Sequence, residues 1–453
     1  MARLESSSFG EILKKILIIG AGWAGLSAAV QATKRGAKVT LLEASNELGG
    51  RARSVQMNGH ALDNGQHILI GAYRATLSLM ASVGLVPQKL LLRQRLDLRD
   101  INGSGFRLLG PKLLPPSLQF LLGLIYCKPW SIKDKYSLIR TAAKWYLSGF
   151  NCDALASVKE ICSELSQPVI DTLITPLCLS AFNTPPYMTS GQVFLRVLND
   201  SMFCGAGGSD FLIPRCDLGK LFPKACERWL VQRGCEIHKN KRVESLNFEY
   251  FSNEPLDTPD AIIVACDATN AARLIKSINP AWAACAERLE FTQIATTYLR
   301  CNDPSYKGLT RPLLMLHSDS EKTSHVDRPA QFVFDRARLF EELEEPSTTK
   351  SNKGVLSFVS SFANLPNEAI TSAVLAQATK ELKLCELEIL GTITERRATF
   401  CCKPALIRPP QSVVEQIWAC GDYIEGPYPS TLEGAVISGE QVIQRVLESF
   451  VEH

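Results

Sequence analysis

Residues 15–53 read KILIIGAGWAGLSAAVQATKRGAKVTLLEASNELGGRAR. The apolar run 16–19 predicts a strand, and the glycine pattern Gly20-x-Gly22-x-x-Gly25 follows it directly. Small and apolar residues at helical spacing come next, and a second strand-like run, 38–42, ends at the acid Glu43. Strand, glycine turn, helix, strand and acid in this order are typical of a dinucleotide site.

The three glycines and the acid have separate physical roles in such a site. Gly20 permits the tight turn, and Gly22, which lacks a Cβ, lets the backbone approach a pyrophosphate. Gly25 lets the helix pack close to the strand, and the free amides at the helix N-terminus face the phosphate charge. Glu43 stands 18 positions after Gly25, where a carboxylate accepts hydrogen bonds from ribose hydroxyls and disfavours a 2′-phosphate.

Two further segments favour FAD over NAD. Gly49-Gly50-Arg51 adds a second glycine turn and a guanidinium that can donate to phosphate oxygens, although alone it would be an ordinary surface loop. Near the other end, the apolar run 417–420 predicts a buried strand that leads into Gly421 and Asp422, where a plain turn residue is the alternative. Ser430 or Thr431 can then cap a helix to about residue 447, whose start would stabilise negative charge on a reduced flavin.

Longer stretches carry a resemblance to known families. GAGWAGLSAAV, LLEASNELGGRARS and CGDYIEGPYPSTLEGAVISG together resemble the FAD-dependent amine oxidase and carotene desaturase superfamily. LDNGQHILIGAYRATLSLM (62–80) and TPLCLSAFNTPPYMTSGQVFLRVLND (175–200) resemble more closely the hydroxysqualene dehydroxylases, bacterial flavoenzymes of squalene and hopanoid synthesis. GSDFLIPRCDLGKLFPKA (208–225) and ERRATFCCKPALIRPP (395–410) fit the same family, so the resemblance spans nearly the whole chain after residue 14.

The resemblance implies an FAD-dependent oxidoreductase and assigns positions to the cofactor. It places the three fingerprint glycines at the pyrophosphate, Glu43 at the adenosine ribose, and Gly50 with Arg51 between phosphate and flavin. Val243, in an expected strand over 241–248, would contact adenine through its backbone, and Asp422 would lie near the ribityl chain or phosphate. Leu432 and Glu433 would stand at the helix start under the flavin. The expected cofactor contacts are Gly20, Ala21, Gly22, Ala24, Gly25, Glu43, Ala44, Gly50, Arg51, Val243, Gly421, Asp422, Leu432 and Glu433.

The fold class that the resemblance implies is α/β. A Rossmann-like FAD-binding domain of the amine oxidase type would be formed by residues 15–84, 206–284 and 391–453, after a lead of residues 1–14. The substrate-binding domain, an α+β unit of mixed sheet covered by helices, would be inserted as a helix-rich segment, 85–205, and a strand-rich segment, 285–390. Alternation of apolar residues predicts strands in TQIATTYLR, PLLMLH, AQFVFD and GVLSFVSSF of that second segment. A chain of 453 residues also exceeds what one core usually serves.

The expected reaction is reductive removal of an allylic hydroxyl from a long polyprenyl substrate. Protonation lets the hydroxyl leave as water, and hydride from N5 of the reduced flavin reaches the allylic cation. The proton donor needs a pKa raised by burial, and Asp63 and His67 are the two candidates. A loop cap for Asp63 and a structural hydrogen bond for His67 are the alternatives. Because no second nucleotide fingerprint occurs, electrons are expected to pass to or from a separate donor or acceptor.

Three other functions stay open on these motifs. A carotene desaturase would use the same N5 chemistry in the oxidising direction. An amine oxidase is disfavoured because no aromatic pair that would frame an amine is identifiable. The flavin-free guanine-nucleotide dissociation inhibitors share the fold, but the intact fingerprint, Glu43 and Asp422 argue against them.

Composition excludes several partners. A net charge of +3, without a basic run, argues against nucleic acid. Fifteen cysteines, an odd number without a C-x-x-C pair, favour reduced thiols in a cytoplasmic protein and no metal site. Lys14-Lys15 and the apolar run after them mimic a secretory signal, but the glycine fingerprint explains the same residues.

The segment 112–135, KLLPPSLQFLLGLIYCKPWSIKDK, suggests a contact with the inner face of the membrane. About ten apolar residues follow Pro115-Pro116 and lead to Trp130, flanked by Lys128, Lys133 and Lys135. An apolar helix with aromatic and basic flanks suits the headgroup region. The alternative is a helix that lines the substrate domain, and both hold if substrate enters from the bilayer.

Overall fold

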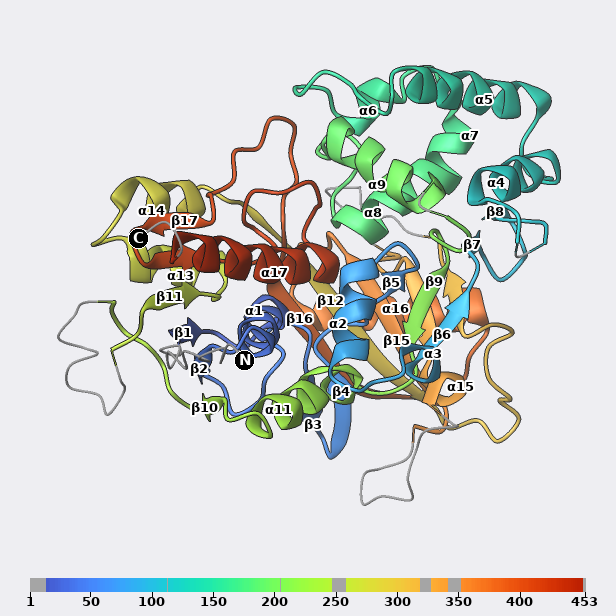
Figure 1. Cartoon of the computed structure of the whole chain (residues 1–453). Helices are drawn as coiled ribbons and strands as arrows, with labels where there is room; N and C mark the ends of the chain where they lie inside the picture. Colours follow the sequence, from blue (N-terminus) through green and yellow to red (C-terminus); the bar gives the residue numbers. More distant parts are fainter. Residues whose placement is uncertain are drawn as a thin grey trace, which may run out of the picture.

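The structure is a computed structural model that describes residues 14–111, 113–203, 205–246, 258–317, 327–340 and 352–450. These residues form a parallel sheet with its helices, an antiparallel sheet, and a group of helices that stands apart at one end of the molecule (Figure 1). Within the described ranges, no helix combines the length and the apolar character needed to cross a bilayer.

The six-stranded sheet is assembled from three distant parts of the chain. Its pairings are parallel except for the edge strand β17, which runs antiparallel to β18. In β1, Ile16 and Ile18 pack with the core around α1 and α17, whereas Leu17 and Ile19 pack with the core around α13. Both faces are therefore buried, which explains the continuous apolar runs of a parallel sheet. The strand order is β10 (Glu236–His238), β2 (Lys38–Leu42), β1 (Lys15–Ile19), β11 (Ala261–Val264), β18 (Ile417–Ala419) and β17 (Ser412–Val414).

Helices cover both faces of this sheet. Figure 1 shows α1 and α17, from opposite ends of the chain, packed side by side. The helix expected after residue 430 is confirmed as α17, and Thr431 is its N-cap, since its Oγ1 accepts from Gly434 N at 3.1 Å. The helices are α1 (Trp23–Lys34), α10 (Leu218–Leu221), α11 (Pro223–Val231), α13 (Ala268–Ile275), α14 (Pro280–Glu287) and α17 (Leu432–Ser449).

The five-stranded sheet confirms the four strands predicted from alternation. All of its strand pairings are antiparallel, whereas a mixed sheet was expected. Residue 391, the expected domain boundary, lies inside β16. This strand pairs with β12 along nearly its whole length, so it belongs to the five-stranded sheet on both sides of that residue. The elements are β13 (Leu313–Met315), β14 (Phe332–Asp335), β15 (Val355–Ser361), β12 (Phe291–Cys301) and β16 (Leu387–Phe400), with α15 (Arg336–Phe340) and α16 (Asn367–Leu382).

A helical cap, defined here as residues 116–203, stands over a small sheet of three strands. The sheet order is β5 (Leu69–Ile70), β9 (Phe211–Pro214) and β6 (Leu91–Gln94), with α2 (Arg74–Ser82) and α3 (Pro87–Leu90) beside it and the hairpins β3 (Ser54–Met57)–β4 (His60–Asp63) and β7 (Asp97–Arg99)–β8 (Gly105–Arg107). The cap contains α4 (Pro116–Ile125), α5 (Ile132–Leu147), α6 (Val158–Ile161), α7 (Gln167–Val169), the π-helix η1 (Ile170–Ile174), α8 (Thr175–Phe182) and α9 (Gly191–Phe203).

One expected strand is wrong in its described part. Residues 241–246 carry no strand, and 247–248 lie outside the described residues. The Arg273 side chain donates to the backbone carbonyls of Val243, at 2.9 Å, and Glu244, at 2.7 Å. A guanidinium therefore satisfies carbonyl groups that a neighbouring strand would otherwise pair.

Candidate functional site

A polar cleft opens at the carboxyl ends of the parallel strands. Its cavity volume is about 510 Å³. Its walls include the residues that directly follow β1, β2 and β11, and Gly421 and Asp422 shortly after β18. Crevices at this edge of an open parallel sheet are where such folds bind ligands. The antiparallel sheet closes the cleft with Glu395, Arg397, Ala398 and Thr399 from the end of β16.

The glycine turn leaves space and free donors for an anion. Gly22 is the N-cap of α1, and no side chain caps this helix. A Cβ on Gly50 would lie 3.0 Å from the Cα of Gly22, so the close approach of the two turns disfavours a side chain at position 50. A Cβ on Gly25 would lie 2.0 Å from the oxygen of Gly20, which shows how tightly helix and strand pack. Uncapped amides beside a wall of glycine suit a pyrophosphate.

Glu43 is held against the same turn. Its Oε2 accepts from Ala21 N at 2.7 Å, and its Oε1 accepts from Ser45 N at 2.8 Å. Each carboxylate oxygen has a further lone pair, so the group can also accept from a diol such as a ribose. Ala44 and Val243 line the cleft beside it.

Arg51 and Asp422 form an ion pair in the middle of the cleft. Arg51 Nη2 lies 2.5 Å from Asp422 Oδ1, and Arg51 Nη1 donates to Ala398 O at 2.5 Å. Ser430 donates to the other oxygen of Asp422. Burial alone would raise the pKa of Asp422, but the Arg51 charge together with the hydrogen bonds from Arg51 and Ser430 outweighs it, and the pKa is lowered. Sequence reasoning expected Arg51 to serve phosphate oxygens and missed this pairing.

Most of the expected cofactor contacts line the cleft. The residues found in its walls are Gly20, Gly22, Ala24, Glu43, Ala44, Gly50, Arg51, Val243, Gly421, Asp422 and Leu432. Ala21, Gly25 and Glu433 are not among them. Ala21 contributes its amide to Glu43, and Gly25 packs against the strand turn. Each of these two therefore shapes the cleft from behind its surface.

Glu433 instead joins two helices. Its carboxylate accepts from Ala75 N at 2.9 Å, Thr76 N at 2.8 Å and Thr76 Oγ1 at 2.7 Å, all in the first turn of α2. A buried carboxylate at a helix N-terminus interacts favourably with the free amides and the helix dipole. Glu433 thus holds α17 to α2. It does not line the polar cleft but borders a neighbouring, apolar cavity.

An apolar cavity meets the polar cleft from the other side. Its volume is about 490 Å³, and side chains of α4, α5, α8, α9, β5 and β9 form most of its wall. The five-stranded antiparallel sheet contributes side chains to the polar cleft and none to the apolar cavity. The outer rim of the apolar cavity includes the exposed side chains of Leu121, Ile139, Tyr146 and Phe203. The two linings share Ile68, Tyr73, Ser180, Ala181 and Thr431.

The segment 112–135 contains the expected apolar helix, but Trp130 does not lie at its surface. Lys112 lies outside the described residues. The apolar stretch is the helix α4, and Phe120, Leu121 and Leu124 line the apolar cavity. The expected interfacial role of Trp130 is wrong, because its side chain is 3% exposed and stacks on Phe106 with ring centroids 5.6 Å apart.

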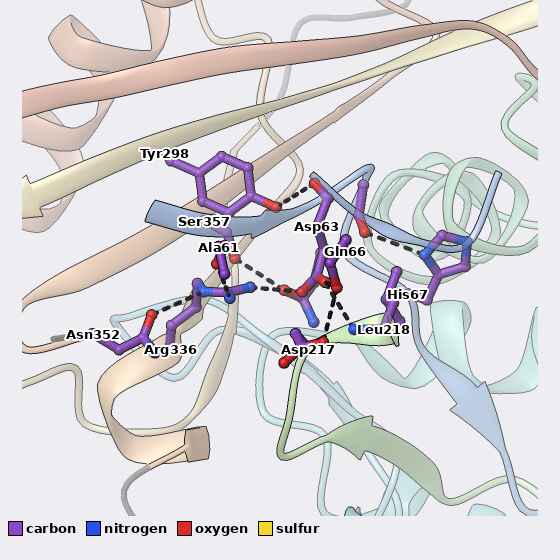
Figure 2. A network of polar contacts seen from close by, with 12 residues as sticks. Ala61, Asp63, Gln66, His67, Asp217, Leu218, Tyr298, Arg336, Asn352 and Ser357 are labelled. Atoms are coloured by element: carbon purple, nitrogen blue, oxygen red, sulfur yellow. Dashed lines mark hydrogen bonds and ion pairs between the residues drawn. The ribbon is translucent and has the colours of Figure 1, made fainter. Parts of the chain in front are cut away.

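Asp63 is engaged in a buried ion pair (Figure 2). Arg336 Nη1 lies 2.8 Å from Asp63 Oδ2, and the two side chains are 0% and 2% exposed. The other oxygen accepts from Leu218 N at 2.8 Å, at the start of α10. Asp63 lines neither cavity, so the contact that a proton donor needs is not present. Its partners indicate a structural role, as the loop-cap alternative did, but with Arg336 and the start of α10 as the groups that it binds.

His67 does line the polar cleft. Its Nδ1 lies 3.2 Å from Gly65 O, which suits a donated hydrogen bond from the neutral ring. Burial lowers the pKa of His67, an effect that the Gly65 carbonyl and the Asp63 charge only partly oppose. A neutral histidine with Nδ1 protonated presents Nε2 as a hydrogen-bond acceptor, so His67 in this state is not the proton donor that the expected reaction needs.

Comparison with known proteins identifies the family of this chain. The family described as flavin containing amine oxidoreductase matches residues 23–447. This chain belongs to that family. As a flavin containing amine oxidoreductase it is an FAD-dependent oxidoreductase, and its α/β fold with a Rossmann-like domain agrees with the family.

Several proteins resemble this flavin containing amine oxidoreductase along nearly its whole length. It is 25% identical over 460 residues to hydroxysqualene dehydroxylase of Rhodopseudomonas palustris, covering 96% of this chain and 98% of the relative. It is 24% identical over 504 residues to zeta-carotene desaturase of Synechocystis, covering 96% and 97%. The crystal structure of an oxidoreductase from Methanosarcina mazei superposes with a TM-score of 0.68 at 16% identity, covering 95% of this chain and all of that one, which supports the fold alone.

Proposed function

We propose that FAD occupies the polar cleft and that the apolar cavity binds a long polyprenyl alcohol, which the protein reduces by removing an allylic hydroxyl, as hydroxysqualene is converted to squalene. The main support for this proposal is that an apolar cavity of about 490 Å³ meets the polar cleft at a shared wall. The full-length likeness to hydroxysqualene dehydroxylase supports the choice of substrate.

The cleft residues have consistent roles in this proposal. The uncapped amides of α1 and the glycines of both turns would hold the pyrophosphate, and Glu43 the ribose. The start of α17 after Thr431 would face the flavin end, where free amides favour negative charge. Bound FAD would supply hydride exchange with carbon. The surrounding side chains orient substrate and exclude water.

The overall reaction balances as a two-electron reduction. A hydride takes the place of the hydroxyl on carbon, and a proton joins the departing hydroxyl to form water. The protein must therefore receive two electrons from a separate donor for each turnover. The cavity lining contributes few charged groups, and this favours an uncharged substrate chain over an amine. Of the two expected proton donors, His67 reaches the cleft, whereas Asp63 lines neither cavity.

Anaerobic incubation of photoreduced, FAD-loaded protein with 12-hydroxysqualene tests this function. We expect squalene to form as the flavin is reoxidised. A flavin that stays reduced, with all of the alcohol recovered, would contradict the proposal. The likeness to zeta-carotene desaturase makes desaturation the second candidate, and conversion of phytoene by the oxidised protein would favour it.

The cavity rim also supports contact with an anionic bilayer, from which an apolar substrate would enter. On α5, Ile132 and Leu147 are 86% and 84% exposed, and Tyr136 is also exposed. Exposed Lys128 and Lys133 flank this surface, as basic residues do at a lipid headgroup layer. The surface continues from the rim of the apolar cavity, so substrate could pass from lipid to cavity without crossing water.

Co-sedimentation with phosphatidylglycerol vesicles and phosphatidylcholine vesicles tests this contact. We expect binding to the anionic vesicles and a loss of about 10-fold or more in the double variant Ile132→Ser/Leu147→Ser, since each side chain would insert apolar area. Val231→Ser, on exposed Val231 of α11 away from the cap, is the matched control (Figure 1). Equal binding of all three proteins would rule out this surface.

A further inference from the structure

The wall shared by the two cavities is the place where a substrate would meet the cofactor. Of its five residues, Ile68 and Ala181 are apolar, and Ser180 donates its hydroxyl to Leu177 O at 3.2 Å. Tyr73 and Thr431 supply the remaining hydroxyl groups. Tyr73 is the titratable member of this set, and its side chain is half-buried.

The backbone holds Tyr73 firmly at this point. Tyr73 is the N-cap of α2, and its amide donates to Ile70 O at 3.0 Å. Thr431 is the N-cap of α17, and its hydroxyl donates to Pro429 O at 3.3 Å. Glu433 binds the first turn of α2 from the first turn of α17. One carboxylate therefore fixes the positions of both N-cap residues relative to each other.

Another polar group in the apolar cavity is already saturated. The Tyr428 hydroxyl donates to Asp200 Oδ2 at 2.6 Å, and Arg196 Nε donates to the same oxygen at 2.8 Å. These three side chains satisfy one another, and Tyr428 and Asp200 border the apolar cavity without reaching the polar cleft. A substrate oxygen near the cofactor would thus meet Tyr73 first.

We propose that Tyr73 is the specificity residue that donates a hydrogen bond to the hydroxyl oxygen of the substrate and holds that carbon beside the cofactor. This inference rests on the proposed function. Burial raises the pKa of Tyr73, and the Glu433 charge adds to the effect, so the phenol keeps its proton at neutral pH. A phenol in this state is a steady donor and a poor acid, which assigns it to binding and orientation rather than to proton transfer.

Ligand binding to the oxidised, FAD-loaded protein tests the inference without turnover. Perturbation of the flavin absorbance would give dissociation constants for 12-hydroxysqualene and for squalene. We expect the preference for the alcohol to fall about 10-fold in Tyr73→Phe, with squalene affinity unchanged, since one neutral hydrogen bond is lost. Tyr187→Phe is the matched control, because Tyr187 is 51% exposed and lines neither cavity.

A second ligand gives a measurement on the unaltered protein. The ketone 12-oxosqualene has nearly the size of the alcohol and an oxygen that accepts but cannot donate. Donation from Tyr73 predicts that the ketone also binds more tightly than squalene. A ketone that binds no better than squalene, or a Tyr73→Phe variant that keeps FAD and the full preference for the alcohol, would overturn the inference. Failure of the reduced wild-type protein to form squalene would instead count against the proposed function.

Discussion

Arg51 and Asp422, 371 positions apart in the chain, are joined by an ion pair of 2.5 Å across the polar cleft. Arg51 follows the second glycine turn, and Asp422 follows strand β18. The Arg51 guanidinium also bonds Ala398 at the end of β16. One side chain thus connects the two sheets and the two ends of the sequence.

We expect Arg51 and Asp422 to be energetically coupled. The side chains are 32% and 10% exposed, so solvent screens the pair only in part. A double-mutant cycle of Arg51→Met and Asp422→Asn, followed by thermal or urea unfolding, should give a coupling energy of about 2 kcal/mol. Strictly additive effects would show that the two side chains are neighbours without a stabilising interaction.

Gly22→Ala and Gly25→Ala should separate cofactor binding from folding. A Cβ on Gly22 has Gly50 Cα at 3.9 Å as its neighbour, and the backbone φ of Gly22 is −70°, so alanine fits the protein. Its methyl group would stand where a pyrophosphate approaches, and we expect FAD affinity to fall about 10-fold or more at unchanged apoprotein stability. Titration of apoprotein with FAD and thermal unfolding measure the two effects.

The matched variant should behave in the opposite way. The Cβ of Gly25→Ala would lie 2.0 Å from Gly20 O, which forces the helix from the strand. We expect the apoprotein itself to lose about 3 kcal/mol or more, because overpacking strains the backbone. If both variants lose stability equally, Gly22 has a structural role in place of a binding one.

Removal of the Glu433 carboxylate should loosen α2 from α17. Glu433→Ala leaves two amides and the Thr76 hydroxyl without their acceptor, and we expect a stability loss of about 2–3 kcal/mol. Hydrogen exchange should rise at the first turn of α2. Glu448→Ala, at the exposed end of the same helix, is the control and should change little.

Asp63→Asn should destabilise the protein more than it slows the reaction. The variant leaves the Arg336 guanidinium buried and without its counter-charge, at a cost of about 3–5 kcal/mol. Turnover per FAD-loaded, folded molecule should stay near that of the wild type, since Asp63 lines neither cavity. A stable Asp63→Asn protein with full FAD content and no turnover would restore the proton-donor hypothesis.

Acidification should reveal that the folded protein keeps the half-buried His67 ring neutral. Its pKa is lowered from the ordinary 6.5 by burial, so the unfolded chain binds the proton more readily than the folded protein. The contribution of His67 to stability is therefore full above pH 6.5 and is lost as pH falls toward the lowered folded value. The free energy of unfolding, measured between about pH 5 and pH 8, should fall less steeply with decreasing pH in His67→Asn than in the wild-type protein. Identical slopes for both proteins would mean that His67 is exposed to solvent.

The elements around the glycine fingerprint were predictable because their causes are local. Strand periodicity, the missing Cβ of Gly20 and Gly25, and the cap at Thr431 each depend on a few neighbouring residues. The same holds for the four strands of the antiparallel sheet. The strand expected around Val243 failed because Arg273, 30 positions away, bonds the carbonyl of Val243.

The roles of the acidic residues were not predictable in this way. Asp63, Asp422 and Glu433 each stand in motifs that suit catalysis or cofactor contact, yet their partners are Arg336, Arg51 and the start of α2. These partners are 273, 371 and 357 positions away. A carboxylate can be counted as a free acid only after its neighbours in space are known.

By itself, the amino-acid sequence determined a dinucleotide-binding α/β fold, the identity of its cofactor and the class of its chemistry. Turn geometry and apolar periodicity act over a few residues, and they are legible along the chain. Only the tertiary structure decided which charges neutralise each other and which hydroxyl, that of Tyr73, stands where the two cavities meet. Those relationships arise when core packing brings distant segments within about 3 Å, the range over which a hydrogen bond acts.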